Sequence, residues 1–181
     1  MVIISPATED DIQGILEIEQ DSFSPAWTHG ALLSEIYKED SYFAVAVEGC
    51  ISPAVADSTP PAVADSTPPA ITDSMPPAVD TAISPAIVGF AVLRQVGDDG
   101  ELLQIAVDKC ARGRGVGDLL MNAALEYARN NALCSIFLEV RRGNIAAVGL
   151  YKKHGFNSVR IRKNYYSDPV EDAVVMVKPL A

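Results

Sequence analysis

A glycine-rich stretch with two arginines is the first part of the chain that could do chemistry. It reads Arg112-Gly113-Arg114-Gly115-Val116-Gly117-Asp118 and follows an apolar segment, residues 102–107. Glycine leaves the backbone uncovered, so a ligand can approach the main chain closely. Apolar spacing from Val116 onward predicts a helix, and the first N–H groups of a helix, with its dipole, attract anions. The stretch therefore indicates a site for a phosphorylated small molecule.

The spacing of the glycines excludes two common phosphate loops. The dinucleotide fingerprint G-x-G-x-x-G needs a third glycine where Asp118 stands, and it normally follows the first strand of a βαβ unit. The nucleotide-triphosphatase loop G-x-x-x-x-G-K-[ST] is absent from the sequence. What remains is Arg112-x-x-Gly115-x-Gly117, preceded by Ile105-Ala106-Val107. A glycine-rich helix start that binds no ligand is the alternative interpretation.

A second candidate is Glu139, a carboxylate in the middle of the otherwise apolar strand predicted over Ser135–Arg141. Strand alternation places it on one face with Phe137 and Arg141, opposite the three aliphatic residues of the strand. A carboxylate in such a place is unusual unless it is paired or functional. Glu139 could therefore have a function, or it could form an ion pair with Arg141. Glu101 is a rival candidate, and its alternative is a solvated strand edge.

The segment after this strand predicts a helix that carries a tyrosine. Asn144 can cap this helix, which runs to His154 and is ended by Gly155. Tyr151 lies on its apolar stripe, where a tyrosine is either a packed core residue or a functional group. The two histidines, His29 and His154, have no partner at the spacing of a catalytic triad or a metal site. We expect His154 to serve packing and His29 to lie on the surface.

Three motifs, in this order, resemble one known family. The glycine stretch follows the pattern [QR]-x-x-G-x-[GA], Leu138–Phe156 follows L-E-V-R-x-x-N-x-x-A-x-x-L-Y-x-x-x-G-F, and Arg162-Lys163-Asn164-Tyr165-Tyr166 comes last. With Ile18-Glu19 and Pro25–Thr28, these motifs resemble the acetyl-CoA-dependent N-acetyltransferases of the GNAT superfamily, in particular the ribosomal-protein-alanine N-acetyltransferases of the RimI type. The resemblance covers the whole chain apart from residues 51–86.

The resemblance implies acetyl-CoA as co-substrate, no metal, and roles for individual residues. In similar enzymes the glutamate at the position of Glu139 is the general base, and the tyrosine at the position of Tyr151 protonates the sulfur of CoA. The acceptor implied is the N-terminal peptide of a small-subunit ribosomal protein, in a groove that could be walled by Trp27, Tyr165 and Tyr166. The cofactor-binding residues implied are Ile105, Ala106, Val107, Arg112, Gly113, Arg114, Gly115, Val116, Gly117, Asp118 and, on the pantetheine arm, Asn144.

Acyl transfer from a thioester to an amine needs residues of these types. The ammonium must lose a proton, and a terminal α-amine with a pKa of about 7.7–8 needs only a modest base at neutral pH. The oxyanion needs hydrogen-bond donors, and a departing thiolate, with a pKa of about 8.5 by analogy with cysteine, benefits from a nearby acid. The alternatives are an acetyltransferase of small amines or lysine side chains, and an acetyl-CoA-binding sensor without catalysis.

Residues 51–86 differ from the rest of the chain. The octapeptide Pro-Ala-Val-Ala-Asp-Ser-Thr-Pro occurs at 53–60 and again at 61–68, and drifted copies follow. Paired prolines forbid a helix and a paired strand, and one Val or Ile per repeat cannot build a core. We therefore expect a disordered, polyproline-like loop that is inserted between two strands of a single domain, residues 1–181.

The remaining segments predict an α/β fold of the GNAT type, with a mixed, mostly antiparallel sheet of six or seven strands and about four helices. The predicted order is β-α-α-β-β-β-α-β-α-β-β. Strands are expected at about 2–4, 42–47, 87–93, 101–107, 135–141, 156–163 and 172–178, with a turn at 97–100. The inward faces of the first three helices are expected to hold Ile12, Ile15, Leu16, Leu32, Leu33, Ile36, Tyr37, Val116, Leu119, Leu120, Ala123, Ala124 and Tyr127.

The charge balance of the chain is acidic, with 14 Lys+Arg against 24 Asp+Glu and a formal net charge of −10. Proteins that bind nucleic acid usually show a basic field, so we expect no nucleic-acid partner. No signal peptide and no apolar run of membrane-spanning length is visible, so we expect a cytoplasmic monomer without membrane contact. The three cysteines are scattered, without metal spacing or a disulfide framework.

Overall fold

The computed structural model describes residues 1–49 and 86–180. The octapeptide repeats lie outside these residues, so the loop expected there stays a prediction. Ala86, assigned to the insertion from the sequence, is instead the first residue of a strand and pairs with Glu48. That assignment is wrong by one residue, because the ladder with the preceding strand continues to Ala86.

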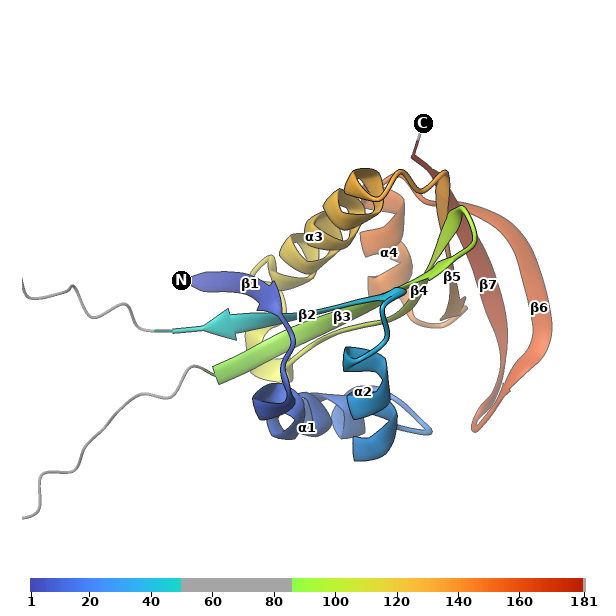
Figure 1. Ribbon diagram of the computed structural model, residues 1–181. Helices are drawn as coiled ribbons and strands as arrows, with labels where there is room; N and C mark the ends of the chain where they lie inside the picture. The colour runs from blue at the N-terminus through green and yellow to red at the C-terminus, as the bar shows by residue number, and fades with distance from the viewer. Residues whose placement is uncertain (50–85, 181) are drawn as a thin grey trace, which may run out of the picture.

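Seven strands form one sheet in the spatial order β1-β2-β3-β4-β5-β7-β6 (Figure 1). The strands are β1 (Val2–Pro6), β2 (Ser41–Glu48), β3 (Ala86–Val96), β4 (Asp99–Val107), β5 (Ser135–Arg141), β6 (Asn157–Ser167) and β7 (Val170–Pro179). Every neighbouring pair is antiparallel except β4 and β5, which are parallel. This confirms the predicted element order and the mixed, mostly antiparallel sheet.

The ends of the strands differ from the prediction where pairing extends them. β6 continues to Ser167, because its last residues pair with the start of β7. The turn between β3 and β4 is shorter than the predicted 97–100. Gly97 adopts φ +64°, and Asp99 and Gly100 already pair with β3. The hairpin loop is thus a two-residue turn, in which a glycine at positive φ is favoured.

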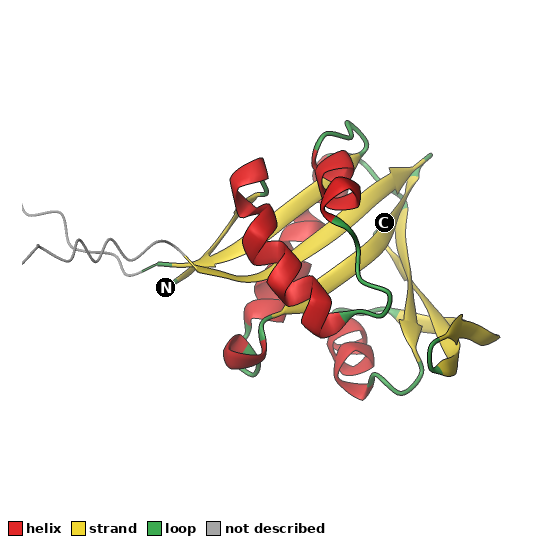
Figure 2. Ribbon diagram, turned by 90° about the horizontal axis from the view of Figure 1, so that it is seen from below, coloured by secondary structure: helices red, strands yellow, loops and turns green. Residues whose placement is uncertain are grey.

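Two helices cover each face of the sheet. In Figure 1, α1 (Ile12–Ser22) and α2 (His29–Ile36) lie below it, and α3 (Val116–Asn130) and α4 (Ile145–Lys153) lie above it. Figure 2 shows the same strands from a perpendicular direction, as a twisted sheet with helices packed across it. Thr28 caps α2, since its hydroxyl accepts the Ala31 N–H at 3.3 Å. Thr8 precedes a 3₁₀ turn, Glu9–Asp11, that leads into α1.

The two helical layers fully or partly bury all but two of the residues predicted to face inward. Ile12, Ile15, Leu32, Val116, Leu120 and Ala124 are all buried. Tyr37 and Leu119 are exposed, so those two predictions are wrong. Tyr37 follows the last residue of α2 and no longer continues its stripe. Leu119 faces solvent because the buried stripe of α3 turns toward Met121 and Leu125.

An irregularity in β4 opens the middle of the sheet. The pairing of β3 with β4 shifts between Val92–Gln104 and Leu93–Leu102, which leaves Leu103 as an extra residue in β4. The parallel ladder between β4 and β5 runs only as far as the Leu102–Leu138 pair. A bulge bends and twists its strand. β4 therefore separates from β5 beyond Leu102, and Glu139 is the first residue of β5 past the last pair.

β3, β4 and α3 pack closely together at Gly89. A Cβ there would lie 2.8 Å from the carbonyl oxygen of Ala106 and 3.1 Å from Cδ1 of Leu120. We expect Gly89→Ala to lower the free energy of unfolding by about 1–3 kcal/mol, since the backbone must shift. Gly30→Ala is the matched control: its Cβ meets nothing within 4 Å, and the change should be neutral or stabilising by up to about 1 kcal/mol. Urea unfolding of both variants measures the difference, and equal midpoints would contradict this packing account.

Candidate functional site

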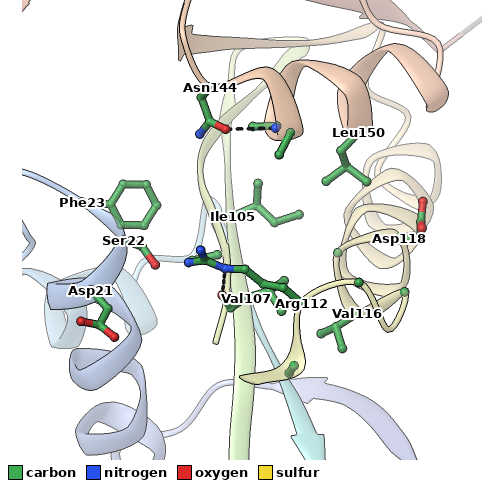
Figure 3. A pocket seen from close by; sticks show the side chains of 17 residues that line it. Asp21, Ser22, Phe23, Ile105, Val107, Arg112, Val116, Asp118, Asn144 and Leu150 are labelled. Carbon is green, nitrogen blue, oxygen red and sulfur yellow. Dashed lines mark hydrogen bonds between the residues drawn. The ribbon is translucent and has the colours of Figure 1, made fainter. Parts of the chain in front are cut away.

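A cavity of about 540 Å³ lies where the glycine stretch, β4, the end of α1 and the start of α4 meet (Figure 3). Its size is typical of a small-molecule site. The lining residues are Asp21, Ser22, Phe23, Ile105, Ala106, Val107, Ala111, Arg112, Gly113, Gly115, Val116, Gly117, Asp118, Asn144, Ala146, Ala147 and Leu150. Ten of these residues were candidates from the sequence, so the structure brings most of the predicted cofactor-binding set together around one space.

The glycine stretch forms the turn that starts α3. Gly113 and Gly115 have φ of +73° and +82°, a backbone conformation that is strained for every residue type other than glycine. A Cβ at either position would meet nothing within 4 Å, so the space beside the backbone is open. α3 begins at Val116, so its first N–H groups have no partner within the helix. The Nε of Arg112 donates to the Val107 carbonyl at 3.0 Å, which holds this arginine across the end of β4. The turn therefore presents an anion-binding geometry to the cavity.

Arg114 is the one member of the stretch that points elsewhere. Its guanidinium donates two hydrogen bonds to the carboxylate of Glu48, at the end of β2. Arg114 is exposed and does not line the cavity. The structure therefore assigns it a contact that ties the turn to the β-sheet, and gives no geometric support for its predicted place in cofactor binding.

Asp118 lines the cavity but is neutralised from α4. Lys153 Nζ lies 2.8 Å from its carboxylate, and His154 Nε2 lies 2.8 Å from Oδ1. These two hydrogen bonds, Lys153 first, hold the pKa of Asp118 below its ordinary value. His154 thus bonds across two helices in addition to packing, a contact that the sequence analysis missed. This contact could not be predicted from the sequence, because Asp118 lies in the first turn of α3 and His154 lies at the end of a different helix, α4.

The start of α4 is built as predicted. The side chain of Asn144 accepts the N–H of Ala147 at 3.1 Å and so caps the helix, and Asn144 also lines the cavity (Figure 3). Gly155 follows the helix at φ +85°, as expected of a residue that ends one. The cap leaves the side-chain amide of Asn144 available to a ligand, because only its oxygen is used by the helix.

Glu139 lies beside the opening between β4 and β5, on the predicted face. The aliphatic residues that alternate with it are buried, whereas the Glu139 side chain is 22% exposed. Its carboxylate accepts a hydrogen bond from Arg162 of β6, not from Arg141, so the ion pair considered from the sequence has a different partner. Hydrogen bonding to Glu139 is also the main cause of a raised pKa of the Tyr165 hydroxyl.

Tyr151 lies on α4 in the turn after cavity-lining Ala147, next to cavity-lining Leu150. Its side chain is only 6% exposed, and its ring packs on Phe156 with centroids 5.9 Å apart. Burial raises the pKa of Tyr151 far above its ordinary value, and the nearby Tyr166 hydroxyl adds to this rise. Tyr151 therefore keeps its proton throughout the neutral range. Neither Tyr151 nor Glu139 is among the residues that line the cavity.

The aromatic pair Tyr165 and Tyr166 lies between these two side chains. The two rings meet edge to face at 5.2 Å. The pKa of Tyr166 is raised by burial and, second, by the charge of Glu139, while Tyr166 in turn raises the pKa of Tyr151. Trp27, the third aromatic residue considered for a groove, packs partly buried against the core beneath α1 and α2.

Glu19 and Gln104 form a buried polar pair that was not predicted from the sequence. Glu19 of α1 is fully buried, and its Oε1 accepts the Trp27 N–H at 2.7 Å and the Gln104 Nε2–H at 2.9 Å. Burial raises the pKa of Glu19. The contacts brace α1 and the start of the α1–α2 segment against the bulged part of β4. In the sequence, the burial of Glu19 is indicated only by its position on the apolar stripe of α1, one turn after Ile15.

Comparison with known proteins follows this geometry. The family model described as "Acetyltransferase (GNAT) family" matches residues 12–156, which include the glycine stretch, Glu139 and Tyr151. The chain belongs to the GNAT acetyltransferase family. The sheet of seven strands, opened between β4 and β5, and the cavity beside it are therefore the GNAT framework of this chain.

Relatives of this GNAT chain share one reaction in their names. The "[Ribosomal protein bS18]-alanine N-acetyltransferase" of Escherichia coli (strain K12) is 36% identical over 97 residues, 52% of this chain and 66% of the relative. The protein of the same name from Haemophilus influenzae is 42% identical over 93 residues, 50% of this chain and 63% of its own. The chain thus spans just under two thirds of these relatives. A Bacillus subtilis (strain 168) relative is 28% identical over 169 residues, 92% of this chain and 88% of its own.

Solved structures agree with the GNAT fold. The crystal structure of the ribosomal-protein-S18-alanine N-acetyltransferase from Escherichia coli has a TM-score of 0.71 at 25% identity, covering 100% of this chain and 95% of its own. Ard1 from Thermoplasma volcanium has a TM-score of 0.73 at 26% identity, covering 99% and 98%. Among the described helices, none is long and apolar enough to cross a membrane. Within residues 1–49 and 86–180, no group of His, Cys, Asp or Glu side chains could hold a metal ion.

The left-handed backbone at Gly115 gives a direct test of the cavity. We expect Gly115→Ala to weaken acetyl-CoA binding about 5- to 30-fold, because an L side chain at positive φ costs about 1–2 kcal/mol and pushes the turn out of its anion-binding shape. Gly149→Ala, on the exposed side of α4 with nothing within 4 Å of the new Cβ, is the matched control and should bind as the wild type does. Isothermal titration with acetyl-CoA reads out both, and equal affinities for the Gly115 variant and wild type would exclude the turn as part of the site.

Proposed function

We propose that this GNAT chain binds acetyl-CoA in the cavity and transfers the acetyl group to the α-amino group of a peptide, the alanine N-terminus of a small-subunit ribosomal protein being the favoured acceptor. The observation that carries the proposal is spatial. An anion-binding turn, the capped start of α4 and the opening next to Glu139 meet around one cavity in a chain of an acetyltransferase family. The names of its relatives supply the acceptor.

The residues of the cavity fit the chemical groups of acetyl-CoA. The unpartnered N–H groups at the start of α3 and the guanidinium of Arg112 suit a pyrophosphate, since both favour negative charge. The free amide of Asn144 and the apolar side chains of Ile105, Ala147 and Leu150 suit a pantetheine arm, which carries amides on a mostly apolar chain. Solved structures with coenzyme A, such as the PaiA acetyltransferase from Thermoplasma acidophilum at 16% identity and a TM-score of 0.65, share the fold.

Glu139 and Tyr151 would divide the proton transfers between them. Glu139 accepts the proton that the attacking amine must lose, directly or through one water, from its place beside the opening between β4 and β5. Its contact with Arg162 is made through one carboxylate oxygen, Oε1. Tyr151 is protonated at neutral pH and donates this proton to the departing thiolate. From ammonium to amide the nitrogen gives up two protons: Glu139 takes one, and the other replaces the proton that Tyr151 gives to the thiolate. Glu139 then releases its proton to solvent, the one proton that the whole reaction sets free.

Three acceptors distinguish the proposal from its alternatives. Release of free CoA thiol is followed with acetyl-CoA and, in turn, an Ala-starting peptide, the same peptide with a blocked α-amine and no lysine, and spermidine. The proposal expects release only with the first. Release with spermidine alone identifies a small-amine acetyltransferase. Tight binding of acetyl-CoA with no release for any acceptor identifies a sensor, and either result would overturn the proposal.

A further inference from the structure

The side chain of Arg141 joins two segments that are far apart in the sequence. Its Nη2 donates to the Asp168 carbonyl at 2.7 Å and to the Ser24 carbonyl at 3.4 Å. Its Nη1 donates to the Pro169 carbonyl at 3.1 Å and to Oε2 of Glu171 at 3.3 Å. One guanidinium therefore connects the segment between α1 and α2 with the hairpin between β6 and β7.

Both segments flank the face of β5 that carries Glu139. Arg141 is two residues farther along the strand than Glu139, so strand alternation places both on the same face. Ser24 comes directly after Ser22 and Phe23, which line the cavity. On the other side, the guanidinium carbon of Arg141 lies 4.2 Å from the ring centre of Tyr166, the neighbour of both Tyr165 and Tyr151. The two connected segments are thus the walls on either side of the proposed reaction centre.

The contacts require an arginine, and not simply a positive charge. Three of the four acceptors are backbone carbonyls, two in the β6–β7 hairpin and one in the α1–α2 segment. The planar guanidinium offers five donors in a fixed fork while it stacks on an aromatic ring. A lysine ammonium at this place could not reach all of them at once. The Arg141 side chain is only 24% exposed, so water competes less for these bonds than it would on an open surface.

Glu171 extends the connection to the start of α4. Its Oε1 accepts the Gly143 N–H at 2.5 Å, while its Oε2 faces Arg141. Gly143 immediately precedes Asn144, the cap of the helix that carries Tyr151. The hairpin, the end of β5 and the start of α4 are therefore held in one network, with Arg141 as its shared donor.

We propose that Arg141 is a positioning residue that fixes the gap between the α1–α2 segment and the β6–β7 hairpin, and so the groove in which the acceptor peptide is held. This inference rests on the proposed function. Arg141 acts on the acceptor side of the centre and has no contact with the residues of the glycine turn among its hydrogen bonds. Its loss should therefore weaken the acceptor and spare acetyl-CoA.

Steady-state kinetics and calorimetry separate these effects. For Arg141→Ala we expect the KM for an Ala-starting peptide to rise at least tenfold, while the Kd of acetyl-CoA, from isothermal titration, stays within twofold. Arg141→Lys should recover less than half of the loss on a logarithmic scale, because it restores the charge but not the fork. Arg142→Ala is the matched control: it neighbours Arg141, its side chain is 65% exposed, and its ion pair with Asp172 is long at 3.7 Å. It should leave both constants within twofold.

Hydrogen exchange gives a readout that does not depend on turnover. The backbone amides of the non-proline residues in 166–171 and 23–26 should exchange faster in Arg141→Lys than in wild type, with the amides of α3 unchanged. An unchanged peptide KM, equal changes in the peptide and acetyl-CoA constants, or full rescue by lysine would overturn the inference. If the wild type transfers no acetyl group to any peptide, the proposed function fails, and the exchange pattern alone then decides whether Arg141 fixes the two segments.

Discussion

Replacing Glu139 by glutamine should lower kcat/KM for an Ala-starting peptide about 10²- to 10⁴-fold at pH 7, the range expected for loss of a general base. Glutamine has nearly the same shape and keeps an acceptor for Arg162, but it cannot take up a proton. The deficit should shrink as pH rises through the pKa of the terminal amine, about 7.7–8, because above it the amine arrives already deprotonated. Stopped assays between pH 6 and 9.5 measure this dependence.

Glu101→Gln is the control that shows whether the loss of activity is specific to Glu139. Glu101 is a carboxylate on the neighbouring strand, where it pairs with Phe137 in the closed part of the β4–β5 ladder. Its replacement should change kcat/KM by less than threefold at every pH. A Glu139 variant whose pH profile is parallel to that of the wild type would remove Glu139 as the base, and a loss confined to Glu101→Gln would transfer the role.

The second large effect is expected at Tyr151. Tyr151→Phe removes only the hydroxyl, so the ring should keep its contact with Phe156 and the fold should be retained. We expect kcat to fall about 10²-fold, the lower end of the range for a general acid, with the KM for acetyl-CoA within threefold. Because the pKa of Tyr151 is raised, the wild type should show no loss of rate from its ionisation up to the most alkaline pH at which the protein stays folded.

Tyr127→Phe provides the control for Tyr151→Phe. Tyr127 of α3 stacks on Tyr42 at 4.5 Å and does not line the cavity. Its hydroxyl should be dispensable, with kcat within twofold of the wild type. Near-wild-type kcat in Tyr151→Phe, measured on protein with unchanged thermal unfolding, would leave Tyr151 with a packing role only, the alternative considered from its place on an apolar stripe.

Local sequence patterns predicted the parts of the fold that local physics determines. The alternation in Ser135–Arg141 predicted both its exact span and the face that carries Glu139. The run of glycines predicted a loop with uncovered backbone that opens a helix. The structure adds that Gly113 and Gly115 in this loop have positive φ, which glycine adopts more readily than other residues. Asn144 was predicted correctly as a helix cap, because a cap is a local contact between residues only three apart in the sequence.

Contacts between distant segments could not be predicted in this way. The sequence offered Arg141 as a partner for Glu139 because the two are close in the strand, whereas folding brings Arg162 from β6 to Glu139 and the β6–β7 hairpin to Arg141. The same holds for Arg114 with Glu48, and for Asp118 with His154. Each of these pairs depends on how strands and helices are arranged in space. The spacing of residues along the chain does not determine this arrangement, so the pairs could not be predicted from it.

The buried pair Glu19 and Gln104 shows a further limit. A stripe of apolar residues predicted that α1 packs against the sheet, but it could not show that a glutamate on the stripe would be buried too. Its Oε1 accepts hydrogen bonds from the Trp27 N–H and the Gln104 amide, whereas its Oε2 is buried without a partner among the described residues. The donors come from a loop and from the bulged strand β4. The bulge is seen only in the pairing register of the structure, and no pattern in the sequence predicted it.

The most direct measurement is the position of the acetyl group. An Ala-starting peptide with one internal lysine is incubated with acetyl-CoA and the protein, and tandem mass spectrometry locates the added acetyl group. The account predicts acetylation of the α-amine by the wild type, at a rate lowered at least 10²-fold at pH 7 in Glu139→Gln. Acetyl found only on the lysine side chain, or on the α-amine at equal rates in the two proteins, would contradict it.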